Sequence, residues 1–119
     1  MKISELKTFI HEGKLDDKLI ELYGEKALDA QKERYAAILD NALQTFSDEE
    51  ARIYSAPGRT EVGGNHTDHQ LGKVLAASLN LDVVACVIPT DDNIVTYASK
   101  GYNVNPVDVS DITIHEEEK

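Results

Sequence analysis

Residues 52–68 read Arg-Ile-Tyr-Ser-Ala-Pro-Gly-Arg-Thr-Glu-Val-Gly-Gly-Asn-His-Thr-Asp, and both the fold class and the candidate site depend on this stretch. Its first five residues alternate as in a β-strand, and we expect Pro57-Gly58 to end that strand. The part that follows gathers an arginine, two carboxylates, a histidine and an asparagine among glycines. Glycines let a backbone approach a ligand closely, and loops mounted on strands often carry binding groups. The stretch is therefore the candidate functional site.

The chain before this stretch predicts helices. Apolar residues recur at helical spacing in three segments, which end at Gly13, at Gly24 and near Phe46. We therefore expect residues 1–47 to be helical, with the three apolar stripes used for packing.

The chain after residue 51 predicts strands. Besides residues 52–56, short apolar runs at 74–78, 81–88 and 94–99 indicate β-strands. The valine-rich run at 81–88 is typical of a strand buried on both faces. The turn that follows it, Pro-Thr-Asp-Asp-Asn, indicates a hairpin between 81–88 and 94–99.

Apolar residues between 107 and 114 suggest one more edge element or two, which gives five strands or more. Helices followed by strands favour an α+β fold with a mostly antiparallel sheet. We expect one domain over residues 1–119, helical over 1–47 and with a strand-rich site region over 51–115.

Composition narrows the class of protein. The chain has 12 Lys+Arg against 22 Asp+Glu, and the net charge of -10 disfavours nucleic acid and anionic membranes as partners. Its single cysteine, Cys86, lies in an apolar run, cannot form an internal disulfide and suits a reducing compartment. No apolar stretch approaches a membrane span, and the first seven residues lack a signal-peptide core. We expect a soluble, cytoplasmic domain.

The side chains of the candidate site suit a polyhydroxylated ligand. Arg59 presents a planar fork of donors that fits a phosphate or a carboxylate. Glu61 and Asp68 accept hydrogen bonds from hydroxyl groups, Asn65 can donate and accept, and His66 can do either. A sugar requires this mixture at close quarters. The alternative is an ion pair of Arg59 with Asp68 or with Glu61 that only fixes the loop.

Other chemistries have less support. His66, Asp68 and His69 admit zinc or iron, but the remaining histidines, His11 and His115, add no ligand pattern, so we expect no metal. A Ser–His–Asp site lacks a serine at a strand-to-helix elbow. The glycines form neither a dinucleotide fingerprint nor a Walker loop.

Residues 56–75, Ala-Pro-Gly-Arg-Thr-Glu-Val-Gly-Gly-Asn-His-Thr-Asp-His-Gln-Leu-Gly-Lys-Val-Leu, closely resemble the galactokinase signature. That signature reads roughly Ala-Pro-Gly-Arg-Val-Asn-Leu-Ile-Gly-Glu-His-Thr-Asp-Tyr-Asn-x-Gly-x-Val-Leu and aligns without a gap. The resemblance spans residues 25–115, and the motif carries nearly all its specificity. It implies the N-terminal portion of a GHMP-superfamily kinase, resembling ribosomal protein S5 domain 2, that phosphorylates galactose at its anomeric hydroxyl with ATP and Mg²⁺.

The resemblance also implies roles for individual residues. Arg59 matches the catalytic arginine between the sugar and the γ-phosphate, where its action is mainly electrostatic. Asp68 matches the aspartate that grips two neighbouring ring hydroxyls, and His66 the histidine beside it. The substrate-binding set that follows is Glu61, Asn65, His66, Asp68, His69 and Gly72.

The chain departs from the signature in three ways. Glu61 stands where the family has asparagine and Asn65 where it has glutamate, so the pair is exchanged. His69 replaces a tyrosine. The superfamily's Pro-x-Gly-x-Gly-x-Ser-Ser phosphate loop and its downstream aspartate do not occur in the 119 residues.

We therefore expect a sugar-binding portion that is inactive as a kinase alone, with ATP and Mg²⁺ bound only by a full-length enzyme. A non-catalytic sugar-binding or regulatory relative is the alternative. A truncated sheet would leave strand edges and apolar surface unpaired, which predicts self-association.

Overall fold

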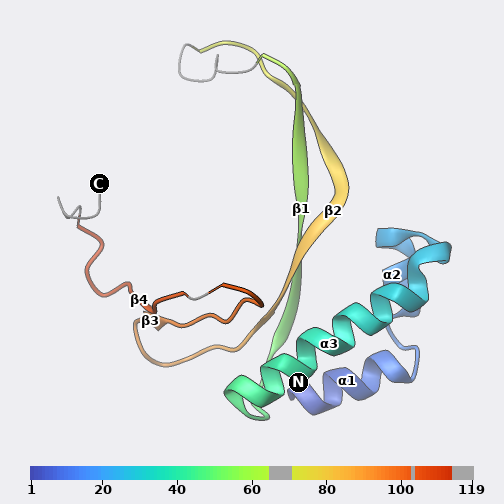
Figure 1. Cartoon of the computed structure of the whole chain (residues 1–119), viewed down its shortest axis with the longest axis vertical. Coiled ribbons are helices and arrows are strands. Elements are labelled where there is room, and N and C mark those ends of the chain that lie inside the picture. Colours follow the sequence, from blue (N-terminus) through green and yellow to red (C-terminus); the bar gives the residue numbers. More distant parts are fainter. Residues whose placement is uncertain (65–70, 103, 114–119) are drawn as a thin grey trace. The chain divides into compact units, whose positions relative to one another are not determined.

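The computed structural model describes residues 1–64, 71–102 and 104–113, and the chain divides into two units, Met1–Ile88 and Pro89–Lys119. The elements of the first unit are α1 (Ile3–His11), α2 (Asp16–Tyr23), the 3-10 turn η1 (Glu25–Ala27), α3 (Leu28–Phe46), β1 (Arg52–Gly63) and β2 (Leu75–Val87). The second unit contains the two-residue strands β3 (Ile94–Val95) and β4 (Val107–Asp108) (Figure 1). Helices first and antiparallel strands after them confirm an α+β fold.

The three predicted helices are confirmed. Glycines with positive φ follow the first two helices, and a hydrogen-bonding aspartate follows the third. Gly13 follows α1 with φ of 73° and Gly24 follows α2 with φ of 83°, a region that L-residues rarely adopt. Asp48, just after α3, accepts hydrogen bonds from the backbone N (2.9 Å) and Oγ (2.7 Å) of Ser4 in the first turn of α1. These bonds lower the pKa of Asp48 and hold α1 against the connection from α3 to β1.

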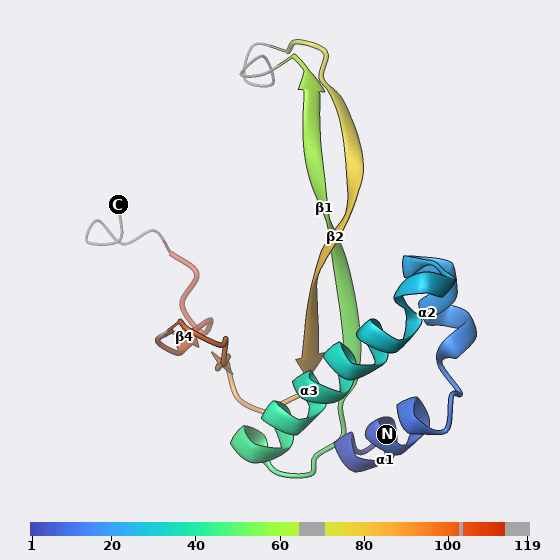
Figure 2. The ribbon, with the colours of Figure 1, turned by 45° about the vertical axis from the view of Figure 1, so that its right-hand side comes forward.

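The hydrophobic core lies mainly among the helices. Its buried residues are Ile3, Ile10, Leu19, Tyr35, Leu39, Ala42 and Ala51. From the strands, Ile53, Val84 and Cys86 pack against this core, and burial raises the pKa of the Cys86 thiol. The core thus joins the helices to one face of the two long strands (Figure 2).

The long strands β1 and β2 form an antiparallel hairpin, and the prediction that Pro57-Gly58 ends β1 was wrong. Pairing runs from Arg52↔Val87 to Pro57↔Asp82 and resumes at Arg59↔Ser78. Across that irregularity β1 advances two residues while β2 advances four, so two extra residues of β2 absorb the disturbance. By continuing through it, β2 joins the two strands predicted at 74–78 and 81–88.

Two further predictions about the strands were wrong. The partner of β2 is β1, not residues 94–99, and within the described residues β3 pairs with β4 to give two sheets of two strands each. The run at 81–88 is not buried on both faces, since Leu81 and Val83 are 73% and 72% exposed. From Leu81 to Val87 exposed and half-buried residues alternate, because helices cover only one face.

We expect Leu39→Ala to lower the free energy of unfolding by about 2–5 kcal/mol, because Leu39 is fully buried and truncation leaves a cavity. Thermal or urea unfolding followed by circular dichroism measures the loss. Leu22→Ala is the matched control, since Leu22 is 46% exposed. Equal losses in the two variants would contradict a helical core centred on Leu39.

Candidate functional site

Arg59 and Glu61 lie on strand β1 and not in a loop after it. Arg59 pairs with Ser78 and Glu61 with Ala76, and the pairing between these two positions is regular. Side chains two apart on a strand point to the same face, so the two charged groups share one face of the hairpin. Both residues are exposed.

Neither charged group is engaged elsewhere in the described part of the chain. Across residues 1–64, 71–102 and 104–113, no ion pair or hydrogen bond involves the side chain of Arg59 or Glu61. The alternative prediction that Arg59 and Glu61 form an ion pair, which only fixes the loop, is therefore wrong. The alternative pair of Arg59 with Asp68 lies outside the described residues.

Most of the predicted sugar contacts also lie outside the described residues, namely Asn65, His66, Asp68 and His69. Gly72 is described and exposed. No group of three metal-ligating side chains occurs in the part of the chain that the structure describes, and a metal held by His66, Asp68 and His69 stays untested.

The backbone at Gly64 passes very close to the backbone of Lys73 and Val74. The φ of Gly64 is 91°, and a Cβ placed on it would lie 2.3 Å from the backbone O of Lys73 and 2.9 Å from the Cα of Val74. Both distances are shorter than real contacts, so only glycine fits without a shift of the backbone. At Gly63 a Cβ meets nothing within 4 Å. Of the two adjacent glycines, Gly64 is the one that the geometry requires.

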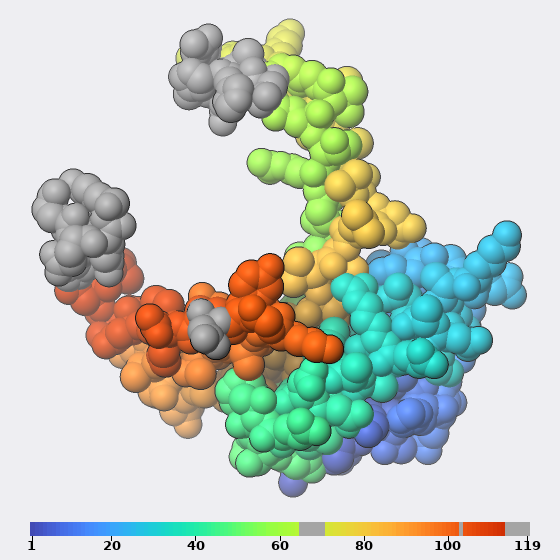
Figure 3. Space-filling model, viewed as in Figure 1, coloured from blue at the N-terminus to red at the C-terminus, as the bar shows by residue number. Residues whose placement is uncertain are grey.

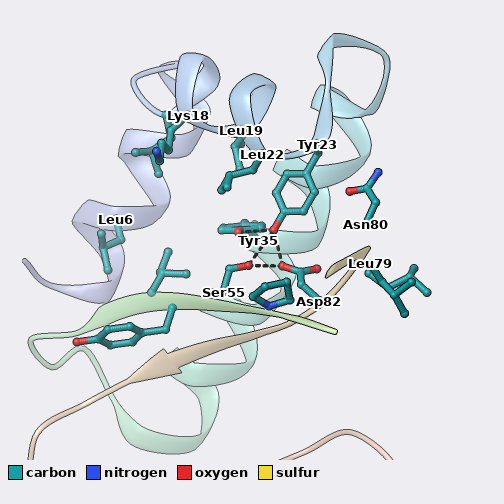
Figure 4. A pocket seen from close by; sticks show the side chains of 15 residues that line it. Leu6, Lys18, Leu19, Leu22, Tyr23, Tyr35, Ser55, Leu79, Asn80 and Asp82 are labelled. Atoms are coloured by element: carbon teal, nitrogen blue, oxygen red, sulfur yellow. Dashed lines mark hydrogen bonds between the residues drawn. The ribbon is translucent and has the colours of Figure 1, made fainter. Parts of the chain in front are cut away.

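A cluster of polar side chains fastens the hairpin to the helices. We call it the Asp82 cluster; its members are Tyr23, Arg34, Tyr35, Ser55 and Asp82. Figure 4 shows all of these except Arg34. The Asp82 carboxylate accepts hydrogen bonds from Arg34 Nη1 (2.7 Å), Tyr23 OH (2.5 Å) and Ser55 Oγ (2.5 Å). Arg34 Nη2 donates to the backbone O of Asp82 (2.9 Å), and the hydroxyls of Tyr23 and Tyr35 are 2.8 Å apart. The cluster joins α2, α3, β1 and β2.

Burial and pairing act in opposite directions on Asp82, whose side chain is only 8% exposed. Burial would raise the pKa of Asp82, but hydrogen bonds from Ser55, Tyr23 and Arg34 and the charge of Arg34 outweigh it and lower the pKa to about 2. Asp82 is thus an anion at neutral pH whose side chain is mostly covered and is paired with Arg34. Sequence analysis missed it, although a lone carboxylate in a valine-rich run is a usable signal for an ion pair within the fold.

A cleft of about 540 Å³ lies where the helices meet the hairpin. Its lining is mostly apolar and includes Leu6, Leu15, Leu19, Leu22, Leu79 and Leu81. The carboxylate and hydroxyls of the Asp82 cluster that face it bond to one another, and neither Arg59 nor Glu61 lines it. A sugar needs several polar groups directed at it, so this cleft is a poor candidate for the sugar site.

Comparison with known proteins gives a family match over the β1–β2 hairpin and the residues that connect its two strands. Residues 43–89 match the family described as galactokinase galactose-binding signature. The matched segment runs from the end of α3 through β1 and β2 and contains every predicted site residue. No solved structure matches the chain. In the described part, no helix is long and apolar enough to cross a membrane.

We expect Gly64→Ala to shift the backbone on both sides of the loop, because its Cβ would collide with Lys73 and Val74. Amide chemical shifts and hydrogen exchange over residues 62–75 measure the change, which on energetic grounds costs about 1–3 kcal/mol. Gly63→Ala is the matched control, with open space around its Cβ. Indistinguishable spectra for the two variants would refute the requirement.

We expect Asp82→Asn to be less stable than the parent chain at pH 7 by about 1–3 kcal/mol, the usual worth of hydrogen bonds to a charged group. Because folding lowers the pKa of Asp82 from an unfolded value of about 3.9 to about 2, its contribution is complete above that unfolded value and is lost as pH falls towards 2. The gap between parent and variant should therefore narrow below pH 4.

Urea unfolding at pH 7, 4 and 2.5 measures this gap. Asp29→Asn, at an exposed aspartate of α3, controls for the loss of one carboxylate. A gap that stays constant from pH 7 to 2.5 would show that the charge of Asp82 does not stabilise the fold.

Proposed function

The chain carries the galactose-binding signature of the galactokinases, and from this premise we propose that it is the sugar-binding portion of a galactokinase. The observation that carries the proposal is the match over residues 43–89. Arg59 and Glu61 support it, because they are exposed and share one face of β1, and because their side chains form no ion pair or hydrogen bond within the described residues.

In the proposed reaction the anomeric hydroxyl of galactose attacks the terminal phosphoryl group of ATP. The bond from that phosphorus to ADP breaks, ADP leaves, and the hydroxyl proton passes to water. The protein acts by positioning and by electrostatics. Arg59 would lie between the sugar and the transferred phosphoryl group. Its delocalised charge would stabilise the negative oxygens and favour loss of the hydroxyl proton. Asp68 would accept hydrogen bonds from two neighbouring ring hydroxyls, and the exchanged pair Glu61 and Asn65 would complete the sugar contacts.

The residues of this chain do not by themselves suit ATP and Mg²⁺. The 119 residues contain no Pro-x-Gly-x-Gly-x-Ser-Ser loop to receive phosphates at a helix N-terminus. We therefore assign sugar recognition to this chain and propose phosphoryl transfer only for a protein that supplies those groups from other residues.

Calorimetric titration of the purified chain with galactose tests the proposal, with glucose as the competitor that differs only at C4. We expect galactose to bind more tightly, and Asp68→Ala to weaken binding by roughly 10-fold or more, since each hydrogen bond to a charged group is worth about 1.5–3 kcal/mol. Asp91→Ala, at an exposed aspartate of the second unit, is the matched control.

Absence of galactose binding at millimolar concentration, or equal binding by the parent chain and Asp68→Ala, would refute the assignment. If galactose binds, adding ATP and Mg²⁺ and measuring galactose 1-phosphate separates recognition from catalysis. We expect no product from the 119-residue chain alone.

A further inference from the structure

We propose that Arg34 and Asp82 are positioning residues for the sugar site. They fix the register of β1 against β2 at the irregularity between Pro57 and Arg59, and so determine the face of the hairpin on which Arg59 and Glu61 lie. The importance of that face rests on the proposed function, whereas the effect on register does not.

The partner of Asp82 in the ladder is Pro57, at the last pair before the irregularity. Proline has no N–H and cannot donate a ladder hydrogen bond. The backbone O of Asp82 accepts a hydrogen bond from Arg34 Nη2 at 2.9 Å, while Nη1 of the same guanidinium donates to Asp82 Oδ1 at 2.7 Å. One arginine of α3 thus holds both the backbone and the side chain of Asp82.

The other strand is fixed at the same level. Ser55, two residues before Pro57 on β1, donates from Oγ to Asp82 Oδ2 at 2.5 Å, and Tyr23 of α2 donates to the same oxygen. These bonds lock β1 against β2 on the helical side of the irregularity. Immediately beyond it, a Cβ on Gly58 would lie 3.3 Å from the backbone O of Leu81, so the strands are in close contact there.

We call the bonds that Asp82 accepts from Arg34, Ser55 and Tyr23 the anchor. Beyond it, the described part of the hairpin is not packed against the helices. Residues 59–63 and 75–80 are all exposed, and Figure 3 shows the green and yellow atoms of this half standing clear of the helices. A slip of one residue in an antiparallel ladder moves every side chain to the opposite face. The anchor at Asp82 therefore decides whether Arg59 and Glu61 face the same way as Ser78 and Ala76.

An engineered disulfide between β1 and β2 beyond the irregularity measures this register, and the measurement needs no sugar. Thr60 pairs with Ala77, and neither belongs to the predicted site, so Thr60→Cys and Ala77→Cys in a Cys86→Ser background should cross-link on mild oxidation. Asp82→Asn and Arg34→Lys are then introduced separately into this double-cysteine background. Arg34→Lys keeps the positive charge but cannot donate two hydrogen bonds from one planar group. Ile10→Val, in the buried helical core, is the control for general loss of stability.

We expect the cross-linked fraction to fall several-fold with Asp82→Asn and Arg34→Lys and to stay unchanged with Ile10→Val. Equal cross-linking in all three variants would overturn the inference. If Asp82→Asn loses its helical circular dichroism, Arg34→Lys decides the matter alone.

The same two substitutions, in the chain without added cysteines, are then titrated with galactose. We expect affinity to fall by roughly tenfold or more, as for a binding group displaced by a shifted backbone. A lost register with unchanged galactose affinity would overturn the positioning role. If the parent chain binds no galactose, the proposed function fails while the cross-linking result still decides the role of Arg34 and Asp82 in register.

Discussion

The carboxylate of Asp82 joins two helices to two strands, and the arrangement of the first unit depends on it. Apolar packing of Ile53, Val84 and Cys86 against the helices holds the hairpin, but such packing has no preferred direction. A buried anion does, because it must meet its donors at fixed angles and distances. Asp82 meets three side chains from three different elements, and these directional bonds favour the observed placement of the hairpin on the helices.

The sequence predicts the helices well and the strand partners poorly, for one physical reason. A helix is defined by contacts three and four residues apart, so the spacing of Ile3, Ile10 and the other core residues is enough to find it. A strand is completed by residues far away in the chain. The run at 81–88 could have paired with 94–99 or with β1 on its composition alone, and its valines do not reveal whether a second layer covers them.

For the candidate site, the motif identified residue types but not the structure that supports them. Arg59 and Glu61 stay predicted site residues, and their position on a strand was missed because Pro57-Gly58 was read as the end of that strand. Gly64 could be named but not distinguished from Gly63, since the closeness of Gly64 to the backbone of Lys73 exists only in the folded chain. Asp82 and Arg34 were missed because they are 48 residues apart in the chain.

The location of Arg59 within a paired strand also affects the thermodynamics of ligand binding. A flexible loop loses conformational entropy when it binds, about 1–2 kcal/mol for each backbone residue that becomes fixed. The backbone of Arg59 is already fixed by pairing with Ser78, so that loss occurs when the hairpin forms and not when a ligand arrives. For an anion that meets this guanidinium, only side-chain rotamers and bound water still have to be ordered.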